Sequence, residues 1–77
     1  MNFGAGQYVF HEGDHGELFY IIEEGEVSCI KEQDSGQQVI RTLTQGMHFG
    51  EIALINNVKR TLSVKSMSNV KLLCLAR

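Results

Sequence analysis

The sequence predicts a mainly β fold, an antiparallel β-barrel or jelly roll of about eight short strands with one short helix. Eight glycines and no proline punctuate the 77-residue chain, and β-branched and aromatic residues gather in short runs between the glycines. Outside residues 50–55, no stretch of helical period reaches the roughly 10 to 12 residues of a full helix. Many short strands with turn signals between them are typical of closed antiparallel architectures.

The strands follow one another between polar turns. They are expected at residues 8–10, 18–23, 26–31, 38–43, 61–65 and 70–75. Asp34-Ser35-Gly36 predicts a hairpin between two of them, because Asp and Gly tolerate the positive φ of tight hairpin turns.

Composition and charge exclude several classes of protein. The chain is 43% hydrophobic and 21% charged with a formal net charge of −2, and its acidic and basic residues are interleaved. We therefore expect neither a nucleic-acid polymer nor a membrane surface as partner. The longest apolar run, Ile52–Ile55, is far below the roughly 20 residues that span a bilayer, and the N-terminus does not resemble a secretion signal. A cytoplasmic location and a single domain over residues 1–77 are expected.

No catalytic or metal-ligating set is expected from the reactive side chains. Cys29 and Cys74 lie far apart inside apolar runs, which favours buried free thiols over a disulfide. His11, His15 and His48 form no His-x-His pair, so metal ligation is not indicated. Nothing resembles a nucleophile elbow, and the chain is short for an enzyme.

Residues 49–64 carry the most informative pattern. Gly50 lets the backbone approach a ligand closely, and Glu51 opens a one-turn helix whose first N–H groups form an anion-seeking end. Arg60 follows the loop and enters a strand beside Thr61, and an arginine fork fits two phosphate oxygens. Two structural explanations compete: an acid at a helix start is favourable in itself by about 0.3–1 kcal/mol, and Glu51 with Arg60 can form a surface salt bridge of about 0–1 kcal/mol.

This stretch resembles, without insertion or deletion, the phosphate-binding cassette of the cyclic nucleotide-binding domains of cAMP- and cGMP-dependent protein kinases. The family pattern runs Phe-Gly-Glu, a short loop, and then Arg followed by Ala or Thr. Residues 12–27 look like the first hairpin of the family, with its Gly-Asp-x-Gly turn. The resemblance implies a regulatory module without enzymatic activity and without a cofactor, which binds a cyclic nucleotide and relays its occupancy to a linked effector such as a protein kinase.

The resemblance also implies a role for each matching residue. Arg60 would pair with the exocyclic oxygens of the cyclic phosphate, and the backbone amides of Ile52 and Ala53 would complete the phosphate site. Glu51 would accept a hydrogen bond from the ribose 2′-hydroxyl, and Gly50 would line the ribose.

The chain departs from the family in two places. The loop 56–59 lacks the proline that many members carry before the arginine, so ordering it on binding costs more. The sequence stops at Arg77, directly after the last expected strand, whereas the family flanks its barrel with helices that include a lid over the base. The resemblance therefore implies a trimmed domain, in which Leu54 matches the residue that couples the phosphate site to a hinge helix.

Two residues favour cGMP over cAMP as the ligand. Thr61 stands where cAMP-selective members usually carry Ala, and its hydroxyl can reach the 2-amino group of guanine. Arg41 shares a strand face with apolar residues, in a segment similar to one of cGMP-dependent kinases, and an arginine fork fits the O6 and N7 acceptors of guanine. Arg41 reaching solvent at the barrel rim is the competing explanation. A cAMP-binding domain of a kinase regulatory subunit or channel, and a structural relic of the fold that binds no ligand, remain the alternatives.

Overall fold

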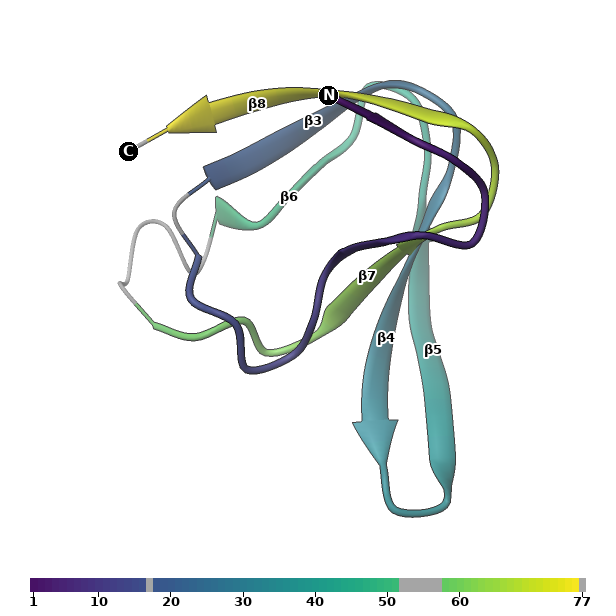
Figure 1. Cartoon of the computed structure of the whole chain (residues 1–77), viewed down its shortest axis with the longest axis vertical. Coiled ribbons are helices and arrows are strands. Elements are labelled where there is room, and N and C mark those ends of the chain that lie inside the picture. The colour runs from purple at the N-terminus through teal and green to yellow at the C-terminus, as the bar shows by residue number, and fades with distance from the viewer. Residues whose placement is uncertain (17, 52–57, 77) are drawn as a thin grey trace.

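The structure is a computed structural model that describes residues 1–16, 18–51 and 58–76. Its strands form two four-stranded antiparallel sheets (Figure 1). The strands are β1 (Asn2–Phe3), β2 (Tyr8–Phe10), β3 (Leu18–Glu24), β4 (Val27–Gln33), β5 (Gly36–Leu43), β6 (His48–Phe49), β7 (Ser63–Ser66) and β8 (Val70–Ala76). The expected short helix falls, from residue 52 on, outside the described residues. Within the described ranges no helix is long and apolar enough to cross a membrane.

The two sheets have the strand orders β1-β8-β3-β6 and β2-β7-β4-β5. The predicted fold class of about eight short strands is confirmed, and β1 and β6 are the two strands for which the sequence predicted no residue range. β1 and β6 contain two residues each, which is too short to show the alternation by which a strand is recognised. The strand expected from Thr61 begins only at Ser63, because the backbone just before it is hydrogen-bonded to a turn instead of a neighbouring strand.

The core lies where the inner faces of the two sheets meet. Ile22 and Leu72 come from the first sheet, Val27 and Val64 from the second, and each is at most 2% exposed. They alternate with more exposed or polar neighbours along their strands, as the pleat of a half-buried strand requires. Because the two sheets pack on each other through this core, β6 of one sheet and β7 of the other lie beside a common cleft.

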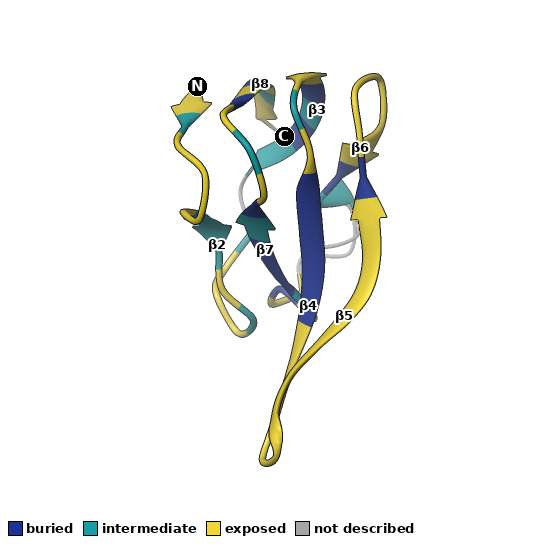
Figure 2. Ribbon diagram, turned by 90° about the vertical axis from the view of Figure 1, so that its right-hand side faces the viewer, coloured by how far each residue is buried: buried dark blue, intermediate teal, exposed yellow. Residues whose placement is uncertain are grey.

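The hairpin of β4 and β5 projects from the body of the molecule, and β5 is exposed along almost its whole length (Figures 1 and 2). Gln33 pairs with Gly36 across a two-residue turn, which confirms the hairpin predicted there. Gly36 takes a φ of 125°, a conformation that favours glycine. A register shift between Cys29 and Ile30 places Arg41 directly across from Cys29.

The two cysteines differ in burial. Both are free thiols as predicted, and Cys29 is buried in β4. Cys74 is only partly buried, although it packs against the core, so the expected full burial is found for Cys29 alone. Burial falls off along β8 toward its end, and the Cys74 Sγ lies 3.8 Å from the Met1 Sδ there.

Candidate functional site

A cleft opens between the inner end of β5, the β6 segment and the residues that lead into β7. Its volume is about 650 Å³ when the space open to solvent is included. Its described lining consists of Phe10, Cys29, Arg41, Leu43, His48, Phe49, Gly50, Glu51, Lys59, Arg60, Thr61, Leu62 and Val64.

Five residues singled out in the sequence meet in this one cleft: Arg41, Gly50, Glu51, Arg60 and Thr61. They come from β5, from the end of β6 and from the approach to β7, so the fold brings together what the chain keeps apart. The remaining predicted site residues, Ile52 and Ala53, lie outside the described residues, and so does Leu54.

Arg60 is the most constrained charged group of the cleft. Only 5% of the residue is exposed, and its Nη1 and Nη2 donate to the carbonyl oxygens of Gly50 at 2.8 Å and Leu18 at 2.6 Å. Its Nε is buried and has no hydrogen-bond acceptor among the described residues. Arg60 and Glu51 form no salt bridge with each other, because the Glu51 carboxylate lies instead against His48, with 3.4 Å between Oε2 and Nδ1.

An aromatic floor supports the Arg60 guanidinium. Its Cζ lies 4.1 Å from the ring centroid of Phe10 and 5.9 Å from that of Tyr20, and Tyr20 stacks on Phe49 with centroids 5.0 Å apart. Ring faces attract a cation, most of all where water is excluded. Burial lowers the pKa of the Arg60 guanidinium from its ordinary value, an effect that nearby Tyr20 and Asp14 oppose. Burial likewise raises the pKa of the Tyr20 hydroxyl. The guanidinium of an arginine stays charged in proteins, so the cleft holds a cation without a carboxylate partner among the described ion pairs.

The backbone of Arg60 is clamped by the turn between β2 and β3. Its N–H donates to the Asp14 carbonyl at 2.7 Å, and its carbonyl accepts from the Gly13 N–H at 2.8 Å. The turn is closed by its own Asp14 side chain, which accepts from the His11 N–H at 2.9 Å. The chain at Arg60 is thus fixed on both sides by backbone hydrogen bonds.

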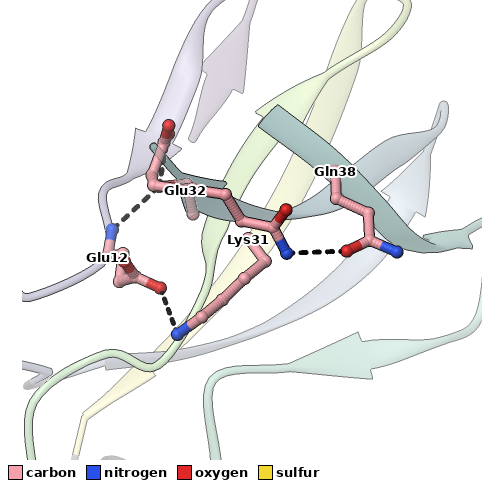
Figure 3. Close-up of polar contacts among 6 residues, drawn as sticks. Glu12, Lys31, Glu32 and Gln38 are labelled. Atoms are coloured by element: carbon pink, nitrogen blue, oxygen red, sulfur yellow. Dashed lines mark hydrogen bonds and ion pairs between the residues drawn. The ribbon is translucent and has the colours of Figure 1, made fainter. Parts of the chain in front are cut away.

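A polar cluster ties this turn to the second sheet (Figure 3). The Glu12 N–H donates to the Ser63 Oγ at 2.8 Å, and the Glu12 carboxylate pairs with the Lys31 Nζ at 2.7 Å. Ser63 starts β7 and is fully buried, while Lys31 lies on β4. The turn that clamps Arg60 is therefore held in place by two strands.

Gly50 is required by both its conformation and its neighbours. Its φ is 91°, which side chains rarely tolerate, and a Cβ at this position would lie 2.7 Å from the Arg60 Nη1. The sequence predicts a glycine here so that the backbone can approach a ligand, and the structure shows that the glycine lets the backbone approach the Arg60 guanidinium.

The charges that line the cleft favour an anion. Arg41, Lys59 and Arg60 stand against the single carboxylate of Glu51 among the described lining residues, although the chain as a whole is acidic. Arg41 is exposed at the base of β5, and burial raises the pKa of the Cys29 thiol opposite it, an effect that Arg41 opposes. A small anion with an apolar part fits such a lining.

Several supporting groups were missed by the sequence analysis. The Leu18 carbonyl, the Asp14 and Gly13 backbone and the Phe10 ring all hold Arg60, yet three of these four contacts are made by backbone atoms. A backbone atom carries no residue-type signal. The Gly-Asp-x-Gly turn at residues 13–16 was noted as a family feature, but its contact with Arg60 spans more than forty positions of sequence.

The fold is a domain of two antiparallel sheets with a cleft whose lining charges suit a small anion. The profile of the cyclic nucleotide-binding domain family matches residues 1–77, and the chain belongs to this family.

Relatives agree in sequence and in fold. The chain is 42% identical over 69 residues to a cAMP-dependent protein kinase regulatory subunit of Mucor circinelloides. The aligned region covers 90% of this chain and 16% of that protein. The regulatory domain of Toxoplasma gondii PKA, solved with cAMP, superposes with a TM-score of 0.95 at 36% identity, over 99% of this chain and 29% of that one. The EAL enzyme Bd1971 in its cGMP-bound form gives a TM-score of 0.96 at 36% identity, over 99% of this chain and 20% of that one.

These relatives correct one expectation from the sequence. A likeness to cGMP-dependent kinases in particular is not supported, because relatives at 35% to 43% identity are regulatory subunits of cAMP-dependent kinases. The chain spans less than a fifth of the length of these subunits.

Proposed function

We propose that the cleft binds a cyclic purine nucleotide, with cAMP as the leading ligand and the cyclic phosphate seated at Arg60. The domain then acts as a regulatory module without catalysis of its own, and relays occupancy to a linked effector such as a protein kinase. The support comes from the geometry of the cleft and from relatives that are cAMP-dependent kinase regulatory subunits.

The single observation that carries the proposal is the buried Arg60 with its unused Nε. A buried charge is costly unless it is paired, and carbonyl dipoles with an aromatic floor compensate it only in part. A cyclic phosphate brings one negative charge and two exocyclic oxygens, which offer the missing acceptor. Arg60 needs no large movement for this contact, because the turn and the aromatic floor already hold it.

The sugar and the base would be recognised by the remaining walls. Glu51 lines the cleft and offers a carboxylate oxygen to the ribose 2′-hydroxyl, and the side-chain-free Gly50 lets the ribose lie close to the backbone. The apolar side chains Leu43, Leu62 and Val64 provide contact area for a purine.

A second ligand, cGMP, is favoured by a different observation. Arg41 and Thr61 both line the cleft and are both exposed, so they are available to a base. Guanine offers O6 and N7 acceptors to an arginine fork, whereas adenine places a donor at N6. The Bd1971 enzyme, which shares this fold, has been solved in cAMP-bound and cGMP-bound forms, and this supports keeping both nucleotides as candidates.

Calorimetric titration of the full chain with cAMP, cGMP and adenosine tests the proposal. We expect both cyclic nucleotides to bind, cAMP more tightly, and adenosine to bind far more weakly because it lacks the phosphate. Equal affinity for adenosine and cAMP would contradict a phosphate site at Arg60. No binding of either cyclic nucleotide would leave the domain as a structural relic of its fold.

A further inference from the structure

Among the described residues, Glu51 has a close polar neighbour that the proposed nucleotide contacts do not use. The imidazole of His48 stands three residues before it, with its Nδ1 3.4 Å from the Glu51 Oε2. Both residues line the cleft. The pair is partly open to solvent, because the His48 side chain is 58% exposed and the Glu51 side chain 37%.

The fold fixes the His48 ring better than its exposure suggests. His48 lies in β6 and pairs with Ile21 of β3, so its backbone belongs to a sheet. Its ring meets the Phe19 ring edge-on, with centroids 6.2 Å apart. Phe19 itself pairs with Leu75 of β8 on the far side of β3, so the ring rests on a three-stranded part of the sheet.

Glu51 needs such a neighbour because Arg60, the arginine with which it could pair, is occupied. Both terminal nitrogens of Arg60 donate to backbone carbonyls, and among the described contacts no side chain other than His48 pairs with Glu51. An unheld carboxylate on a half-exposed side chain samples several rotamers, and ordering it on binding costs affinity. A carboxylate oxygen carries about two acceptor sites. With Oε2 held by His48, Oε1 remains available for a ligand hydroxyl.

We propose that His48 is a positioning residue that holds the Glu51 carboxylate toward the ribose, and so sets how strongly the site prefers a nucleotide with a 2′-hydroxyl. This inference rests on the proposed function and adds a residue to its ribose site. His48 itself touches no part of the ligand in this account and acts only through Glu51.

Two substitutions separate the polar role of the ring from its packing role. His48→Phe keeps an aromatic ring against Phe19 and removes the donor. His48→Asn removes the ring but keeps an amide N–H close to the position of the imidazole Nδ1. Titrating the full-chain wild type and each variant with cAMP and 2′-deoxy-cAMP gives the preference for the hydroxyl as a ratio of affinities.

We expect His48→Phe to lower that ratio by up to about fivefold, the factor for one lost polar pair at an exposed site, and His48→Asn to retain most of it. An unchanged ratio in His48→Phe would overturn the inference, and so would equal losses for both nucleotides in the two variants, which indicate a structural role. If the wild type binds neither nucleotide, the proposed function fails as well.

A measurement without ligand tests the pair itself. In the ligand-free protein, Glu51→Gln should shift the ¹⁵N resonance of the His48 Nδ1, because that nitrogen loses the carboxylate charge 3.4 Å away. An unmoved resonance would show that the two side chains do not interact in solution and would overturn the inference, whatever the affinity for nucleotides.

Discussion

The two arginines on the walls of the cleft are held in opposite ways. Arg60 is 5% exposed, bonded through both terminal nitrogens to carbonyls, laid over Phe10 and clamped at its backbone by the 11–14 turn. Arg41 is exposed on β5, the edge strand of its sheet, and no described hydrogen bond fixes its side chain. A group held before the ligand arrives loses little conformational entropy on binding, whereas an unheld one must be ordered. We infer that Arg60 contributes mainly affinity and Arg41 mainly discrimination between bases.

Removing the held arginine should have the largest effect. Arg60→Ala deletes the cation that faces the phosphate, and we expect a loss of about 2–5 kcal/mol in binding free energy for both cAMP and cGMP. Arg60→Lys should restore only part of it, since an ammonium cannot reproduce the planar fork. Calorimetry measures both, with Lys71→Ala as a control that removes a cation from β8, outside the cleft lining. Unchanged affinity in Arg60→Ala would show that the phosphate does not bind at Arg60.

Displacing Arg60 without deleting it should have the next largest effect. Gly50→Ala places a Cβ 2.7 Å from the Arg60 Nη1 in a backbone conformation at φ 91°, and we expect about 1–3 kcal/mol of lost stability together with weaker nucleotide binding. Gly46→Ala is the matched control, because Gly46 has a φ of 88° with nothing within 4 Å of its Cβ position. Denaturant unfolding should show a lower free energy of unfolding in both variants because of backbone strain, whereas only Gly50→Ala should lose nucleotide affinity. Equal affinity losses would mean that backbone strain, and not the contact with Arg60, is responsible.

Substitutions of the exposed cleft residues Arg41 and Thr61 should change the preference between guanine and adenine. Arg41→Ala should weaken cGMP by about 1–3 kcal/mol, the usual value of a bidentate base contact, and barely change cAMP. Thr61→Ala should weaken cGMP by about 1–2 kcal/mol for one lost hydrogen bond with an unpaired polar group. The two side chains address different edges of one base, so their effects should nearly add. If both variants weaken cAMP binding as much as cGMP binding, Arg41 and Thr61 do not discriminate between the two bases.

Loosening the turn that clamps Arg60 should have the smallest effect. Lys31→Met breaks the 2.7 Å pair with Glu12, and we expect about 0.5–1 kcal/mol of lost stability with a similar loss in nucleotide affinity. Lys71→Met breaks a longer pair, 3.8 Å from Glu23, on the other sheet, and should leave affinity unchanged. Thermal unfolding and calorimetry on both variants check this difference. If the two variants behave alike, the pair with Glu12 does not support Arg60.

The sequence predicted the fold class and the members of the cleft better than their contacts. The strands 8–10 and 70–75 were predicted within a residue of their ends, because glycine punctuation and apolar runs report on local structure. β1 and β6 were missed, since two residues show no periodicity.

The site follows the same rule. One sequence motif contains Gly50, Glu51 and Arg60, which predicts that they lie together. All three do line the same cleft. Their partners were not predictable, because the carbonyl of Leu18 and the backbone of Asp14 are placed by pairing between strands far apart in sequence. The pairing of Glu51 with His48 was missed although the two are three residues apart, since no periodicity favours a contact between a strand and the turn after it.

Arg60 is the proposed phosphate contact, and its buried Nε reports on that contact directly. The ¹H–¹⁵N resonance of the Arg60 Nε can be followed in the full chain while cAMP is added, with Arg60→Lys used to assign it. Because this N–H has no acceptor among the described residues before binding, a phosphate oxygen should move the proton resonance strongly downfield and slow its exchange with water. A resonance that stays in place while cAMP binds would show that the phosphate lies elsewhere and would contradict the account.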